Sequence, residues 1–432
     1  MTYDYDVVVI GGGPAGSVLG SLLAQAGHSA LILERDIHPR DHVGESFTPS
    51  SNVIWERIGF LAKMEEAGFV HKPGAPWTAP RAPVGQFFAI HLTEFPIPGS
   101  PIPYTFNVER DVFDTMLIRH AHELGAKVLQ GVGATKVLFE GERATGVTVK
   151  VAEGWERDVT ARFVVDATGR RSILANQLGL RRNDPEFNQF AIWSWFRGVE
   201  PIAEGYEGYQ GLHFLGLEQA WAWQIPIRHG LCSVGVVAKK PHFAKSGRTH
   251  QEFFDSLISR NRSLAHLMRS AERVKPWWIE GDYSYKIVRL SGPGWLMVGD
   301  ALRFVDPIFS TGVDVASYSA MHAHQAISDV LGGRATEAEA FAAWERRVTD
   351  GVDAWYDLIS IFYKLQNLFT AFAVRKRFRE NVVRIIQGNL YIPETVQRAR
   401  EMIEVMEEAY VKVMADPNNL LRVGALDPEV AA

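Results

Sequence analysis

A stretch near the N-terminus, residues 6–36, most limits what this chain can fold into. It reads DVVVIGGGPAGSVLGSLLAQAGHSALILERD. A β-branched apolar run precedes glycines at positions 11, 13 and 16, and a helical pattern then leads to a second apolar run that ends at Glu34. Strand, tight turn, helix and strand in this order predict a βαβ unit that binds a dinucleotide.

The residue types explain the chemistry expected of this unit. Gly11 allows the tight turn, Gly13 lets the backbone approach a pyrophosphate, and Gly16 lets the helix pack closely on the strand. Glu34 stands near the position of the acid that binds ribose hydroxyls, and the helix N-terminus would face the phosphates. An incidental glycine turn is the alternative, but the surrounding strands and the acid favour the dinucleotide site.

The composition narrows the classes of partner. The 432 residues are 47% hydrophobic and carry a net charge of −5, without the basic excess that nucleic-acid binding requires. Cys232 is the single cysteine, so no intrachain disulfide forms, and no Cys or His cluster predicts a metal site. No uncharged apolar run is long enough to span a membrane, and no signal peptide precedes the first strand. We expect a cytoplasmic protein.

Four further stretches carry a family resemblance. They are VGES (43–46), VERDVFD (108–114), ARFVVDATGRRS (161–172) and GWLMVGDALRFVDPIFSTGVDVA (294–316). Together with the glycine motif they resemble the FAD-dependent aromatic hydroxylases and halogenases. The resemblance implies FAD as the cofactor, with a helix that starts near Gly312 and points at the flavin, where its N-terminus would stabilise negative charge.

The resemblance also implies which residues contact the cofactor. In this chain they are Gly11, Gly13, Pro14, Ala15, Gly16, Glu34, Arg35, Glu45, Ser46, Arg110, Asp166, Gly169, Asp300, Gly312 and Val313.

The stretch AWAWQIPIR (220–228) separates halogenases from hydroxylases. In a strand, Trp221, Trp223 and Ile225 would share one face. WAWQIP fits the WxWxIP pattern of flavin-dependent halogenases, in which the bulky strand is held to separate flavin from substrate so that halide intercepts the oxidant. A strand face packed into an ordinary core is the alternative reading of the two tryptophans.

Two more matches support the halogenase resemblance. GFVHKPGAPW (68–77) matches the segment that carries the active lysine of halogenases, which makes Lys72 the candidate, although an isolated lysine would be read as solvated surface. DPIFSTGV (306–313) matches the halide-binding loop, where the Thr311 hydroxyl and the Gly312 N–H are suitable chloride donors. A plain helix cap by Ser310 or Thr311 is the alternative there.

The resemblance covers nearly the whole chain and is strongest to halogenases of a pyrrole or phenol ring tethered to a carrier protein. It rests on DPEFNQFAIWSWF (184–196), DYSYKIV (282–288) and the long helical C-terminus. Phe309 stands where tryptophan halogenases carry a glutamate, which implies an electron-rich ring as substrate. The basic run AVRKRFREN (373–381) is a candidate docking patch for an acidic carrier, with a solvated helix face as the alternative.

We therefore expect an α/β fold: a Rossmann-like FAD-binding domain, an antiparallel substrate sheet and a helical C-terminal region. The FAD-binding domain would be discontinuous, covering 1–80, 105–180 and 280–330. The substrate-side sheet would cover 81–104 and 181–279, and the helical region 331–432.

The expected activity is FADH2-dependent chlorination, with reduced flavin supplied by a separate flavin reductase. Trp221, Trp223 and Lys72 would be catalytic, with the lysine holding hypohalous acid by a hydrogen bond or forming a chloramine. Three alternatives stay open: a flavin hydroxylase, a halogenase of a free phenol, and a flavoprotein reductase or redox sensor without oxygen chemistry.

Overall fold

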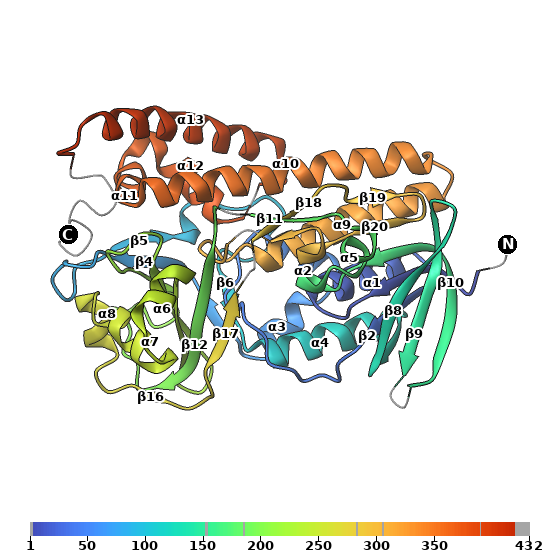
Figure 1. Ribbon diagram of the computed structural model, residues 1–432, viewed down its shortest axis with the longest axis horizontal. Helices are drawn as coiled ribbons and strands as arrows, with labels where there is room; N and C mark the ends of the chain where they lie inside the picture. The colour runs from blue at the N-terminus through green and yellow to red at the C-terminus, as the bar shows by residue number, and fades with distance from the viewer. Residues whose placement is uncertain are drawn as a thin grey trace.

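The molecule is built from two main sheets and a set of helices that lies along one side of both (Figure 1). The computed structural model describes residues 3–151, 154–184, 186–281, 284–304, 306–388 and 390–419. Parts of the expected elements, including residues 282–283 of DYSYKIV, Pro185 and residues 420–432, lie outside the described residues. Within the described ranges, no helix combines the length and apolar character that a membrane crossing requires.

The helices of the described residues have these bounds: α1 (Pro14–Gln25), α2 (Ser51–Arg57), α3 (Leu61–Glu66), α4 (Arg110–Glu123), α5 (Ile173–Leu178), α6 (Lys240–Ser246), α7 (His250–Ile258), α8 (Arg262–Leu267), α9 (Gly312–Leu331), α10 (Glu337–Lys364), α11 (Gln366–Val374), α12 (Lys376–Ile386) and α13 (Pro393–Ala415).

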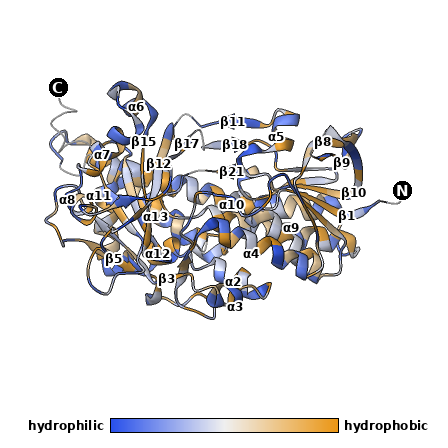
Figure 2. Ribbon diagram, turned by 90° about the horizontal axis from the view of Figure 1, so that it is seen from below, coloured by the Kyte–Doolittle hydropathy of each residue, from blue (hydrophilic) through white to orange (hydrophobic). Residues whose placement is uncertain are grey.

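The first sheet has the parallel order expected of a dinucleotide fold. Its strands are β1 (Tyr5–Ile10), β2 (Ala30–Glu34), β7 (Lys127–Gln130), β8 (Val132–Glu140), β9 (Arg143–Val151), β10 (Glu156–Asp166), β19 (Ser291–Gly292) and β20 (Trp295–Met297). Central β1 pairs in parallel with both β2 and β10, and its residues Val7–Ile10 are buried. The hydropathy colours mark β1 and β10 as hydrophobic (Figure 2). Strands buried on both faces need such continuous apolar runs.

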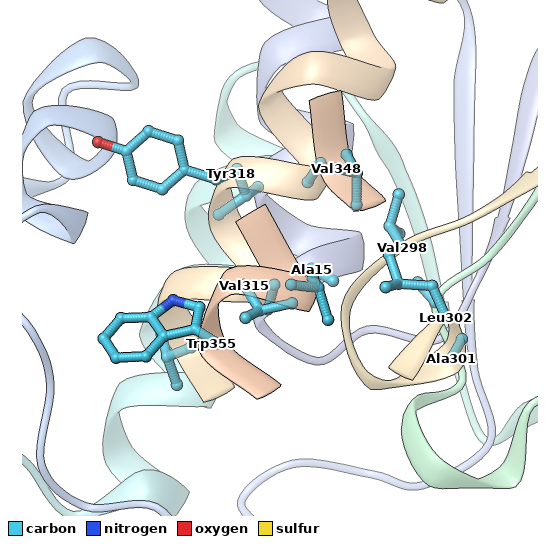
Figure 3. Close-up of a cluster of buried hydrophobic side chains, with 14 of the residues drawn as sticks. Ala15, Val298, Ala301, Leu302, Val315, Tyr318, Val348 and Trp355 are labelled. Carbon is cyan, nitrogen blue, oxygen red and sulfur yellow. The ribbon is translucent and has the colours of Figure 1, made fainter. Parts of the chain in front are cut away.

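Helices α1, α9 and α10 pack together beside this sheet. A cluster of buried side chains that includes Ala15, Val315 and Val348 joins the three helices (Figure 3). Helix α10 begins with a capping box, in which the hydroxyl of Thr336 accepts the backbone N–H of Glu339. The long C-terminal helices are thus anchored on the first sheet.

The second sheet is mainly antiparallel and carries the tryptophan strand near its centre. Its strands are β4 (Gly74–Thr78), β5 (Phe88–His91), β12 (Gln189–Arg197), β13 (Gly211–Phe214), β14 (Trp221–Ile227), β15 (Leu231–Lys239), β16 (Glu272–Arg273) and β17 (Trp278–Gly281). Trp221, Trp223 and Ile225 enter the main core, whereas Ala222 enters a second core. Gly235 of β15 makes room for an indole, since a Cβ there would lie 2.2 Å from the Trp223 ring.

Two smaller sheets join the parts. One contains β11 (Arg181–Asn183), β18 (Tyr285–Ile287) and β21 (Arg303–Phe304), and the other contains β3 (Val70–Lys72) and β6 (Thr105–Asn107). Strand β4 lies within the 1–80 range expected for the FAD-binding domain, yet it pairs with β5 and β13 of the second sheet. The expected fold class is confirmed, while the domain boundaries stay a prediction.

Candidate active site

The turn between β1 and α1 has the geometry that the glycine motif predicts. Gly11 has a φ of +110°, and a Cβ there would lie 2.3 Å from the carbonyl oxygen of Ala167. A Cβ on Gly16 would lie 1.9 Å from the carbonyl oxygen of Gly11, so the close approach of α1 to β1 requires glycine. At Gly13 the nearest atom to an added Cβ is on Arg40, 3.6 Å away. This leaves the N-terminus of α1 open to an anion.

A cavity of about 370 Å³ lies at this turn and extends to the second sheet. Its lining includes these predicted cofactor residues: Gly11, Gly13, Pro14, Ala15, Glu34, Arg35, Glu45, Ser46, Arg110, Gly169, Asp300, Gly312 and Val313. Trp221, Trp223 and Ile225 also line it. Its volume falls in the range of ligand sites, roughly 300–1,000 Å³. The open glycine turn, the helix N-termini and the acidic groups fit the phosphates and hydroxyls of FAD.

Gly16 and Asp166 lie outside the cavity lining. The side chain of Asp166 is fully buried and accepts the backbone N–H groups of Thr168 and Leu174, at 2.9 and 2.8 Å. In this structure the Asp166 carboxylate therefore holds the loop after β10, and Gly16 serves the packing of α1.

The charged groups of the cavity are held by specific partners. Arg110 forms two hydrogen bonds with Asp114, at 2.8 and 3.0 Å, and donates to the carbonyl of Val43 at 2.7 Å. Burial raises the pKa of Asp300 to about 6, against the opposing effect of Arg170 and Arg110. A carboxyl of this kind gains from a hydroxyl partner, which the ribityl chain of FAD would provide.

The tryptophan strand is connected to the cofactor side by a polar chain. The Trp223 indole donates to the Ser233 hydroxyl at 3.1 Å, and Ser233 donates to Glu45 at 3.1 Å. Glu45 also accepts the Trp195 indole N–H at 3.2 Å, and burial raises the pKa of its carboxyl. Trp223 is thus fixed both by packing and by contact with the VGES segment.

Lys72 is buried at the end of β3, with 4% of its surface exposed. Its Nζ donates to the carbonyl of Phe47 at 2.8 Å, and burial lowers its pKa from 10.5 to about 7. The reading of an isolated surface lysine is therefore wrong. The structure does not place Lys72 in the lining of the cofactor cavity, although Ser46, beside Phe47, is part of that lining.

The predicted halide loop ends at the N-terminus of α9. Thr311 is the N-cap residue and is buried, but its side chain makes no capping hydrogen bond, so the cap alternative does not describe it. Ser310 has a φ of +58° and donates to the side-chain oxygen of Gln210 at 3.1 Å. Ser310 and Gly312 line the cavity, whereas Thr311, the predicted halide donor, is not part of the lining.

Sequence reasoning missed three residues that connect these parts. Gln210 also accepts the Ser46 hydroxyl at 2.9 Å, so one amide joins the VGES segment to the halide loop. Tyr363 of α10 accepts the Trp221 indole N–H at 2.8 Å and donates to Asp306 at 2.9 Å. Asp306 stands in the quoted loop motif, but Gln210 and Tyr363 have no local signal, because their partners are distant in sequence.

The fold and the cavity define a protein of the FAD-binding class. A family profile described as an FAD binding domain matches residues 4–348, and the chain belongs to that family. Within it the chain is a flavin-dependent halogenase, as its relatives show.

One relative, from Pseudomonas fluorescens Pf-5, is named 1H-pyrrole-2-carbonyl-[peptidyl-carrier protein] chlorinase. It is 37% identical, over 97% of this chain and 96% of the relative. The corresponding brominase of Pseudoalteromonas luteoviolacea is 31% identical, over 89% of this chain and 92% of the relative. The solved structure of the flavin-dependent brominase Bmp2 aligns with a TM-score of 0.82 and 30% identity, covering 94% of this chain and 99% of Bmp2.

Proposed function

We propose that this halogenase chlorinates an electron-rich aromatic ring, a pyrrolyl or phenolic acyl group, carried on an acyl or peptidyl carrier protein. The observation that carries the proposal is the tryptophan strand, which forms a wall of the cofactor cavity, together with a buried amine, Lys72, that is not part of the cavity lining. Such an arrangement separates the place where an oxidant forms from the place where a ring is attacked.

FAD, reduced by a separate flavin reductase, would when bound give two electrons to O2 and so supply the peroxide-level oxidant that converts chloride into hypohalous acid. The chain's own residues would hold that cofactor: the α1 N-terminus would bind the pyrophosphate, Glu34 the ribose and Asp300 the ribityl hydroxyls. Trp221 and Trp223 exclude an aromatic substrate from this cavity. Oxygen therefore cannot pass directly to the ring.

The halide is proposed to bind where α9 begins. The N–H groups of the first helical turn attract an anion, and Gly312 brings them to the cavity. Ser310, two residues before Gly312, has a left-handed backbone conformation and donates a hydrogen bond to Gln210. This bond orients the loop.

Lys72 is proposed to direct the halogen to the ring. A buried amine with a pKa of about 7 is partly neutral at neutral pH, so it can hold hypohalous acid by a hydrogen bond or accept halogen as a chloramine. In either case the substrate ring is presented to an oxidant of fixed position, which is the proximity effect.

Two relatives named for pyrrolyl carrier-protein substrates support the carrier. A pyrrole ring offers few contacts, so its free form would bind weakly, while an arm raises its effective concentration. Arg375, Lys376 and Arg377 are exposed at the junction of α11 and α12, beside the exposed Val374. Arg379 forms an ion pair with Glu94, so we leave it out of the proposed docking patch. The docking patch is therefore proposed to be residues 374–377.

Two comparisons of product test the proposal. With reductase, FAD, NADH and O2, chlorinated product should form only when chloride is present; an added oxygen that is independent of chloride would support the hydroxylase alternative. Turnover should also require the carrier-loaded acyl group. Equal turnover of the free acid would leave a halogenase of a free phenol or pyrrole. Free tryptophan should not react, since Phe309 stands where tryptophan halogenases carry a glutamate.

A further inference from the structure

Asp306 is a buried carboxyl whose hydrogen bonding is incomplete. Only 2% of its surface is exposed. Oδ1 accepts the backbone N–H of Ile308 and the hydroxyl of Tyr363, both at 2.9 Å. Oδ2 has no hydrogen-bond partner within the described part of the chain. Burying an unpaired polar atom costs free energy, so such an atom in a native structure calls for an explanation.

The position of this carboxyl links the main elements of the site. Tyr363 connects it to the indole N–H of Trp221, on the strand that walls the cofactor cavity. Asp306 also begins the loop that contains Phe309. The ring centroids of Phe309 and Phe362 are 5.2 Å apart, and Phe362 precedes Tyr363 in the chain. The Tyr363 hydroxyl thus lies between the tryptophan strand and the halide loop, on the side covered by α10.

Aromatic halogenation creates a need that Phe309 cannot meet. When the ring attacks the halogen, a carbon–halogen bond forms, and a ring proton must then leave to restore aromaticity. Phenylalanine cannot accept a proton. We propose that the pair Tyr363–Asp306 takes up this proton, with Tyr363 in contact with the ring and Asp306 acting through it. This inference rests on the proposed function.

The transfer balances without a further reactant. The ring C–H bond breaks and its electron pair returns to the ring. The proton passes to the Tyr363 oxygen as the Tyr363 proton passes to Asp306, which becomes neutral. Hypohalous acid that gives up its halogen leaves hydroxide, and the proton finally released from Asp306 converts this hydroxide into water.

The surroundings of Asp306 suit a proton acceptor. Burial raises its pKa to about 7, and only the Ile308 N–H and the Tyr363 hydroxyl offset that effect among the described residues. An acceptor works best when its pKa lies near the working pH. Lys72 titrates in the same range, but it controls the supply of halogen rather than the departure of the ring proton.

The test compares the rate of product formation in a single turnover from protiated and from ring-deuterated carrier-loaded substrate, measured in separate reactions. Wild type at pH 8 should show no primary isotope effect, because proton removal is fast. Ile308 and Tyr363 both donate to Oδ1, so Asp306→Asn keeps the one acceptor oxygen that they use but accepts no proton. It should slow halogenation roughly 100-fold and reveal a primary isotope effect. Tyr363→Phe, which keeps the ring, should show the same effect. In wild type the effect should appear as the pH falls below about 7.

Asp314→Asn is the matched control. Asp314 is another fully buried carboxyl with a raised pKa and an unpaired Oδ2, but its Oδ1 accepts from Ser50 and Ser51 and not from Tyr363. Its variant should show no isotope effect. Wild-type rate without an isotope effect in both Asp306→Asn and Tyr363→Phe would overturn the inference while leaving the proposed function intact. Absence of any halogenated product from wild type would instead overturn the proposed function.

Discussion

The cavity proposed to hold FAD and the region proposed for halogen transfer, beyond the tryptophan strand, are built differently. Around the β1–α1 turn the chain leaves a cavity of about 370 Å³, shaped by backbone and small residues. Beyond the tryptophan strand the space is filled by side chains, with Phe309 packed against Trp355, Phe362 and Phe369. The proposed cofactor site is thus preformed, while the region around Phe309 is closed by side chains of α10 and α11. Substitutions in the cavity should therefore change FAD affinity, and substitutions in the halogen-transfer region should change halogenation without changing FAD affinity.

The largest expected effect comes from Lys72→Met. Methionine fills a similar volume but offers neither a donor nor an amine nitrogen. Halogenation should fall by roughly 100-fold or more, the usual cost of a deleted catalytic donor. FAD affinity and O2 consumption should stay at wild-type values, because Lys72 is outside the cavity lining. Product yield and oxygen uptake measured in one sample check this; near-normal halogenation would remove the lysine from the mechanism.

The same substitution should change stability in a pH-dependent way. Burial lowers the pKa of Lys72 from 10.5 to about 7, so between these values the unfolded chain binds the extra proton. Wild-type stability should therefore rise with pH across that interval. Lys72→Met should be more stable by several kcal/mol at pH 7, and the gain should shrink towards pH 10.5. Denaturant unfolding at several pH values measures this; a gain independent of pH would contradict the burial of a titrating amine.

Substitution of Gly13 should lower FAD affinity, whereas substitution of Gly16, in the same motif, should lower stability. Gly13→Ala leaves the fold intact, since its Cβ meets nothing closer than 3.6 Å, but it narrows the approach for pyrophosphate. FAD affinity should fall about tenfold, equivalent to about 1.4 kcal/mol. Gly16→Ala would place its Cβ 1.9 Å from a carbonyl oxygen and should lower the free energy of unfolding by about 1–3 kcal/mol. Flavin titration and denaturant unfolding distinguish the two; equal losses in both assays would show that Gly13 only shapes the fold.

The cofactor side was also the easier side to predict from sequence. The β1–α1–β2 unit is local, so glycine spacing and apolar runs determine its geometry, and the predicted strand that ends at Glu34 is observed. The alternating faces of β14 follow from strand periodicity and are confirmed. The hydrogen bond of Lys72 to the Phe47 carbonyl and the bridge by Gln210 were not predictable, because they depend on partners brought together only by tertiary packing.

The smallest expected effect concerns binding of the carrier protein at the proposed docking patch, residues 374–377. Reversing the charge of Arg375 and Arg377 should weaken binding of an acidic carrier about tenfold at low salt and less at high salt. FAD content should not change. Arg379→Glu is the contrast, since that arginine is engaged with Glu94 and its loss should mainly destabilise the α12 region. Carrier affinity that is unchanged in the Arg375 and Arg377 variant would place the docking surface elsewhere.

The central claim is that the oxidant formed from O2 in the cofactor cavity oxidises chloride and does not transfer oxygen to the aromatic ring. It is tested most directly by running the complete reaction, with chloride and carrier-loaded pyrrolyl substrate, under isotopically labelled O2. The account predicts a chlorinated acyl group without oxygen label, and all label in water. Label incorporated into the ring would contradict the account and identify the enzyme's chemistry as hydroxylation.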